Sequence, residues 1–135
     1  LNTFGVSRTG QYRINERNRG NLLAQTLMSE ILGQHYEEPN ATVKFGRERS
    51  ENMASRAAWD DVDDYLMLKQ MPKDSDGNVI PNTAGWTWIA SIERVNPLDL
   101  SQTLGSETGV KRITVTVCHG DRAVVSWVAV RTNAR

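Results

Sequence analysis

Residues 11–34 read QYRINERNRGNLLAQTLMSEILGQ, and their pattern of polar and apolar residues predicts the main helix of the fold. Residues 13–19 are polar, with Ile14 as their one large apolar side chain, whereas the second half carries apolar residues at spacings of three and four. Such spacing places the apolar residues on one face of a helix. We therefore expect a continuous helix from about Gln11 to Gln34 whose first two turns project from the globular part or lie along its edge. The apolar stripe consists of Leu23, Leu27, Met28, Ile31 and Leu32.

Both ends of this helix carry signals. Gly33 is expected to end it, because glycine can adopt the left-handed conformation that satisfies the last carbonyl groups. Pro39 excludes a much longer helix. At the other end, a polar half-helix usually continues from or packs on something else. Since the chain also begins with Leu1 rather than methionine, we expect a piece of a longer protein whose upstream part is missing.

The periodicity becomes strand-like after Pro81. Residues 86–95 (WTWIASIERV) are rich in β-branched and aromatic residues, and the face that carries Trp86 and Trp88 is expected to be buried. Residues 111–117 alternate, which predicts that Ile113, Val115 and Val117 face the helix. Residues 123–130 are apolar on both faces except at Ser126, which favours a central strand covered on both sides. A turn at His119-Gly120 should join the last two strands.

Together these segments predict an α+β fold, with a long N-terminal amphipathic helix packed on a C-terminal antiparallel β-meander of three or more strands. At 135 residues the chain is expected to form one domain. Within it, residues 1–36 carry the helix, 37–85 form an irregular region, and 86–135 form the sheet. In the middle region, residues 37–58 are expected to form a surface loop or a short helix. Residues 74–78 (DSDGN) do not match the EF-hand pattern and are expected to form the tip of a turn.

Composition and motifs exclude several classes of function and of site. Sixteen acidic residues balance sixteen basic ones, so the net charge does not indicate binding to nucleic acid or to an anionic membrane. No apolar run approaches the roughly 20 residues that span a bilayer. The single cysteine, Cys118, excludes an internal disulfide and a cysteine-based zinc site. No Gly-rich phosphate loop, GxSxG or HExxH motif is present, and nothing brings His35 and His119 together, so we expect no enzyme.

The one dense group of chemically functional side chains in the sequence is the acidic block around residue 62, in the segment WDDVDDY. Aspartates here can cap a helix start or turn by accepting backbone N–H bonds, while Trp59, Val62 and Tyr65 pack inward. They can also bind a hard cation such as Ca²⁺, which prefers six to eight oxygen ligands, or supply paired catalytic carboxylates. We expect the structural role first and the Ca²⁺ role second, with no other cofactor. The four carboxylates belong to Asp60, Asp61, Asp63 and Asp64.

Several of these segments resemble soluble regions of prepilin-type proteins. They are RGNLLAQTLMSEILGQHYEEP, RAAWDDVDDY, DSDGN, GWTWIASIERVNP, TGVKRITVTV and VAVRT, which together extend over nearly the whole chain. The chain looks most like minor pilins of the mannose-sensitive haemagglutinin type. Members of that family carry a leader peptide and an apolar helix of about 20 residues ahead of the polar helix, and this sequence has neither.

The resemblance implies a structural subunit of a type IV pilus or related filament. The missing apolar helix would anchor the subunit in the inner membrane before assembly, and the head would lie in the periplasm or on the cell surface. Its partners would be other pilin subunits and the assembly machinery, with no nucleic acid. Two alternatives stay open: a pseudopilin of type II secretion, and a free-standing secreted binding module that uses the tryptophan-bearing sheet or the aspartates.

Overall fold

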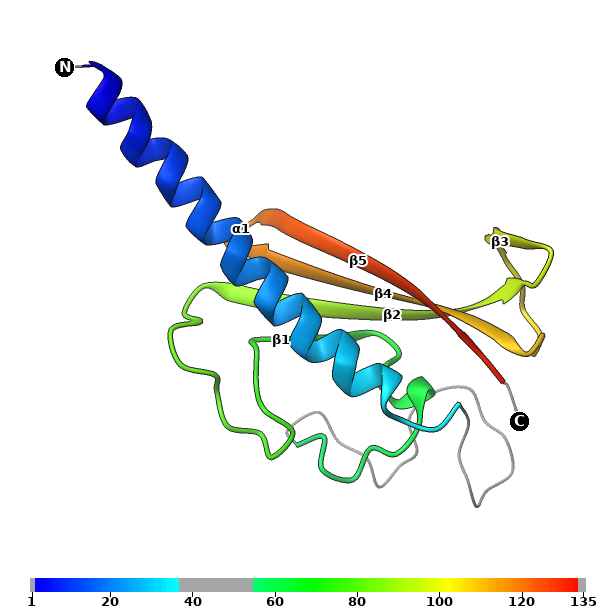
Figure 1. Ribbon diagram of the computed structural model, residues 1–135. Helices are drawn as coiled ribbons and strands as arrows, with labels where there is room; N and C mark the ends of the chain where they lie inside the picture. The colour runs from blue at the N-terminus through cyan, green and yellow to red at the C-terminus, as the bar shows by residue number, and fades with distance from the viewer. Residues whose placement is uncertain (1, 37–54, 134–135) are drawn as a thin grey trace.

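The computed structural model describes residues 2–36 and 55–133, with side chains from residue 11 onward. One long helix lies across one face of an antiparallel sheet (Figure 1). The strands follow the order β1-β2-β4-β5, and β3 pairs with the end of β2. In chain order the elements are α1 (Asn2–Leu32), the 3₁₀ helix η1 (Val62–Tyr65), β1 (Leu68–Gln70), β2 (Trp86–Asn96), β3 (Asp99–Thr103), β4 (Val110–His119) and β5 (Arg122–Thr132).

The predicted fold class is wrong as stated. The structure is α+β, but the sheet contributes more of it than the helix does. Strand makes up 42%, and the part of α1 whose side chains are described, Gln11–32, contributes 22 residues. The sheet has five strands and is not confined to residues 86–135: β1 comes from the segment expected to be irregular, and β3 lies between the segments 86–95 and 111–117 that were predicted as strands. Three residues are too few to show a period, and β3 is exposed throughout. Neither strand therefore has the alternation that marks a half-buried strand.

The helix buries its apolar stripe as expected, except at its last residue. Leu23, Leu27 and Ile31 belong to the core, whereas Leu32 stays exposed. Residues 11–15 are exposed, and in Figure 1 this end of α1 extends beyond the sheet. The helix ends at Leu32, and the Gly33 amide donates to the Ser29 carbonyl at 3.1 Å. Gly33 does not adopt the left-handed conformation that was expected for it.

The inner face of the sheet follows the predicted alternation. On β2, Trp86, Trp88, Ala90 and Ile92 are buried, and the residues between them are half-buried. On β4, the side chains of 113, 115 and 117 are fully buried in the same cluster as the helix stripe. The predicted pairing of β4 with β5 through the Gly120 turn is confirmed.

The prediction of a central, doubly covered strand at residues 123–130 is wrong. Strand β5 stands at the end of the strand order, paired with β4 on one side. Its outward side chains are exposed, with Val128 62% accessible. An apolar run on both faces does not distinguish a covered strand from an edge strand, because β-branched residues suit a strand on either face.

Candidate functional site

The acidic block starts η1, which is the structural role expected for it. Asp61 is the N-cap, and its Oδ1 accepts the Asp64 amide at 3.1 Å. In return, Asp64 Oδ2 accepts the amides of Asp60 and Asp61 at 2.8 and 3.1 Å. This reciprocal arrangement is a capping box. Trp59, Val62 and Tyr65 are buried beside it, as predicted.

Three of the four predicted ligands also converge. Asp60, Asp61 and Asp64 each offer a carboxylate oxygen, and these oxygens lie within 4.8 Å of one another. A Ca²⁺ ion held there would need further oxygens from solvent or backbone to reach its usual six to eight.

Asp63 points elsewhere, to Lys111 on β4. The Lys111 ammonium lies 2.7 Å from Asp63 Oδ1, donates to the Tyr36 carbonyl at 2.8 Å, and sits 4.0 Å from the Tyr36 ring centroid. Both side chains are almost completely buried. Burial raises the pKa of Asp63 above its ordinary value, against the lowering effect of Lys111. This pair ties η1 to the sheet and removes Asp63 from the candidate cation site.

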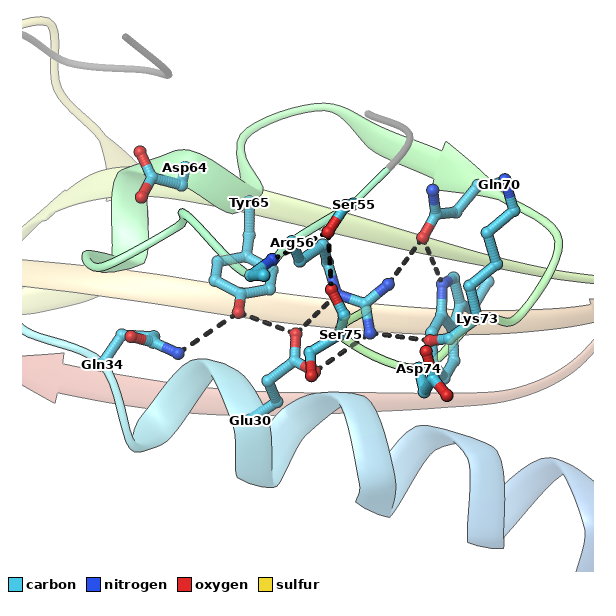
Figure 2. A network of polar contacts seen from close by, with 12 residues as sticks. Glu30, Gln34, Ser55, Arg56, Asp64, Tyr65, Gln70, Lys73, Asp74 and Ser75 are labelled. Carbon is cyan, nitrogen blue, oxygen red and sulfur yellow. Dashed lines mark hydrogen bonds and ion pairs between the residues drawn. The ribbon is translucent and has the colours of Figure 1, made fainter. Parts of the chain in front are cut away.

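A second buried cation, Arg56, joins α1 to the segment that precedes η1 (Figure 2). Its guanidinium donates to both carboxylate oxygens of Glu30, at 2.6 and 3.0 Å, and to Gln70 Oε1 at 2.8 Å. It also donates to the Lys73 carbonyl at 2.7 Å and lies over the Trp88 ring. Arg56 and Glu30 are 26 positions apart, and no local motif marks them, so sequence reasoning missed this pair.

Tyr65 extends this network. Its hydroxyl donates to Glu30 Oε2 at 2.7 Å and receives a longer bond from Gln34 Nε2 (Figure 2). Burial, followed by the neighbouring Glu30 carboxylate, raises the pKa of Tyr65, so the hydroxyl stays protonated. The last turns of α1 are therefore fixed to the head by charged hydrogen bonds as well as by apolar packing.

A third polar cluster holds the middle of α1 at the other end of the sheet. Glu16 is 9% exposed, and its carboxylate accepts bonds from Arg122 and from His119 Nδ1, the latter at 2.8 Å. The His119 ring stacks on Trp86 with centroids 4.4 Å apart. These contacts form the Glu16 clamp, which consists of Glu16, His119 and Arg122. No sequence pattern predicts this cluster, because Glu16 lies in the polar half of the helix, where a glutamate is expected to face solvent.

Two shallow hollows flank the clamp. One, of about 220 Å³, is lined by Tyr12, Arg19 and Trp86 among others. The other, of about 210 Å³, is lined by Arg13, Arg17 and Arg122 among others. This end of the molecule therefore combines aromatic surface with several guanidinium groups.

No helix among residues 2–36 and 55–133 has both the length and the apolar character needed to cross a bilayer. Comparisons of the chain with family models, with curated proteins and with solved structures return no match. The resemblance to prepilin-type proteins stays a prediction.

Proposed function

We propose that this chain is the head of a structural subunit of a type IV pilus or related filament and that it acts by assembly rather than by turnover. The observation that carries the proposal is the division of α1. Its residues 23–31 are built into the core of the head, whereas residues 11–15 are exposed and extend past the sheet (Figure 1). A helix of this kind can continue into a neighbouring structure and carry the head with it.

The polar contacts of α1 support the same proposal. The Glu16 clamp holds the helix where it leaves the head, and Arg56 holds Glu30 in its last turns. With both regions fixed, a displacement of the helix moves the whole head. A filament subunit requires this coupling, because a helix packed in the filament core must set the position of the head outside it.

The test is to express the parental gene, shear filaments from the cell surface, and search them for this chain by mass spectrometry. The same cells are fractionated before assembly, and the 135-residue head alone serves as the control. The proposal expects the chain in the filaments and the unassembled gene product in the inner membrane, with its head outside the cytoplasm. A gene product found soluble in the cytoplasm and absent from filaments would overturn it. Detection in a secretion complex would point to the pseudopilin alternative.

A second candidate is a secreted binding module that uses a cation. The convergence of Asp60, Asp61 and Asp64 favours it. Ca²⁺-dependent binding by the head alone, with no association with filaments, would place this candidate first.

A further inference from the structure

The end of strand β2 and strand β3 form a hairpin that projects beyond the sheet, on the opposite side of the molecule from the N-terminus (Figure 1). We call residues 96–103 the arm. Every residue of β3 is exposed. Leu98 is 96% accessible and Leu100 is 43% accessible. The arm therefore presents leucine side chains to solvent in a chain that has a well-formed apolar core elsewhere.

The arm is ordered by hydrogen bonds from its base. Arg112 on β4 donates to the Leu100 carbonyl at 3.0 Å and to Glu93 Oε2 at 2.5 Å. Within the arm, Asn96 donates to Gln102 Oε1 at 2.9 Å. A surface held in one conformation before binding loses less entropy when it docks.

The tip also carries a charge. The Asp99 carboxylate accepts the Ser101 hydroxyl at 2.6 Å and the Ser101 amide at 3.2 Å. These bonds lower the pKa of Asp99, so the group is ionised at neutral pH. The arm thus offers a carboxylate at Asp99, next in sequence to the exposed Leu98 and Leu100.

The opposite end of the molecule has the complementary chemistry. Tyr12 is 59% exposed over the hollow that it shares with Trp86. The neighbouring hollow presents Arg13, Arg17 and Arg122 beside the Glu16 carboxylate, which lines both hollows and is paired with Arg122. Asp121, in the turn beside Arg122, lines a different hollow. We call the Tyr12 and Arg17 hollows together the receiving end.

We propose that the arm of one copy of this chain docks at the receiving end of the next copy. Leu98 enters the hollow between Tyr12 and Trp86, and Asp99 pairs with the arginines beside it. The occupant is a second copy because the arm, with two exposed leucines and one anion, and the aromatic, arginine-lined hollows are matched in chemistry and belong to one chain. The two patches lie at opposite ends, so the contact is head-to-tail and extends into a chain of subunits. This inference rests on the proposed function and names a contact between heads within the filament.

The test uses sedimentation equilibrium of the purified chain at low salt, with circular dichroism to establish that each variant is folded. Leu98→Ser removes the arm contact, and Arg13→Glu/Arg17→Glu reverses the charge of the receiving end. Val79→Ser is the matched control, since Val79 is a 52% exposed apolar residue outside both surfaces. We expect the wild-type mass to rise with concentration, and Leu98→Ser to weaken association at least tenfold while Val79→Ser leaves it unchanged.

Mixing the two variants tests the contact between the arm and the receiving end more specifically. The Leu98→Ser protein keeps a receiving end and the double arginine variant keeps an arm, so an equimolar mixture should form a 1:1 dimer that does not grow. Adding Asp99→Arg to Arg13→Glu/Arg17→Glu should restore self-association. A wild-type chain that stays monomeric up to about 1 mM, or equal effects of Leu98→Ser and Val79→Ser, would overturn the contact.

The two proposals fail separately. A monomeric head, with the gene product still present in sheared filaments, removes the arm contact and leaves the proposed function. Head-to-tail association of the purified chain, with the gene product absent from filaments, supports the contact and removes the proposed function.

Discussion

Buried charged residues, each with a nearby partner of opposite charge, fix the relative positions of the elements in this protein. Lys111 and Asp63 join β4 to η1, and Arg56 and Glu30 join the segment before η1 to the helix. A buried ion pair adds little net stability compared with an apolar pair, but removing one partner leaves an uncompensated charge. Such pairs therefore show their importance when they are broken singly.

We expect Lys111→Met to destabilise the head by about 3–5 kcal/mol, because Asp63 would stay buried without its counter-charge. Asp63→Leu should cost a similar amount, and the double variant should cost clearly less than the sum. Urea denaturation of the four proteins measures this coupling. Strictly additive effects would show that the two side chains do not act as a pair.

The acidic block allows a test of cation binding. If Ca²⁺ binds at Asp60, Asp61 and Asp64, an excess at 100 times the Kd should stabilise the native state by about 2.7 kcal/mol. The melting temperature in Ca²⁺ is compared with that in chelator, and Asp60→Asn should abolish the difference. Asp76→Asn, at an exposed turn, is the control. An identical melting temperature in both conditions would leave these aspartates with the capping role alone.

At the scale of elements, α1 approaches β5 closely where the helix crosses the edge strand. A Cβ atom on Gly20 would lie 2.9 Å from Val124 Cγ1. The glycine thus sits inside a helix, where it is unfavourable by roughly 1 kcal/mol relative to alanine, at a point where the backbone approaches β5. Farther toward the N-terminus, the Glu16 clamp fixes the same helix to the hairpin between β4 and β5.

Gly20→Ala should destabilise the protein despite its better helix propensity. Overpacking costs about 1–3 kcal/mol, and the branched Val124 side chain has little freedom to move away. Val124→Ala in the same chain should recover most of the loss. Thermal unfolding of the single and double variants measures both effects, with Asn18→Ala on the exposed helix face as control. A more stable Gly20→Ala protein would mean that the helix and β5 can separate without loss.

Glu16→Gln should loosen the middle of α1 without unfolding the head. The neutral amide loses the charge-assisted bonds with Arg122 and His119, at a cost of about 1–3 kcal/mol. Hydrogen exchange should then speed up for the amides of residues 16–22 but change little for those of 25–31, which are packed in the core. Unchanged exchange at 16–22 would show that the clamp does not hold the helix.

For the molecule as a whole, one core joins both layers. The helix stripe, the residues around η1 and the inner faces of β2 and β4 belong to a single buried cluster. Helix and sheet should therefore unfold together, although the exposed turns of α1 can fray independently.

Leu27→Ala is the test at this scale. The side chain is fully buried between the layers, so its truncation should cost about 2–5 kcal/mol. Tryptophan fluorescence and helical circular dichroism should report the same lowered melting temperature. A fluorescence transition that stays in place while the helix signal melts earlier would divide the head into two units.

The features that could be predicted from the sequence are those whose signals are local. The helix stripe follows from spacings of three and four, the inner faces of β2 and β4 from alternation, and the capping role of the aspartates from their preference for helix starts and turns. Each of these patterns lies within one element, so it can be recognised without knowing what the element contacts.

The fold as a whole sets the strand order beyond the predicted β4–β5 pair, together with the buried ion pairs. In the structure, β5 is an edge strand, and β1 and β3 belong to the sheet. Asp63 pairs with Lys111 instead of joining the other aspartates, and Glu16 binds His119, which lies 103 positions away in the sequence. Strand order and buried ion pairs depend on the packing of the whole chain, and a polar residue has the same local signature whether it meets solvent or a distant counter-charge.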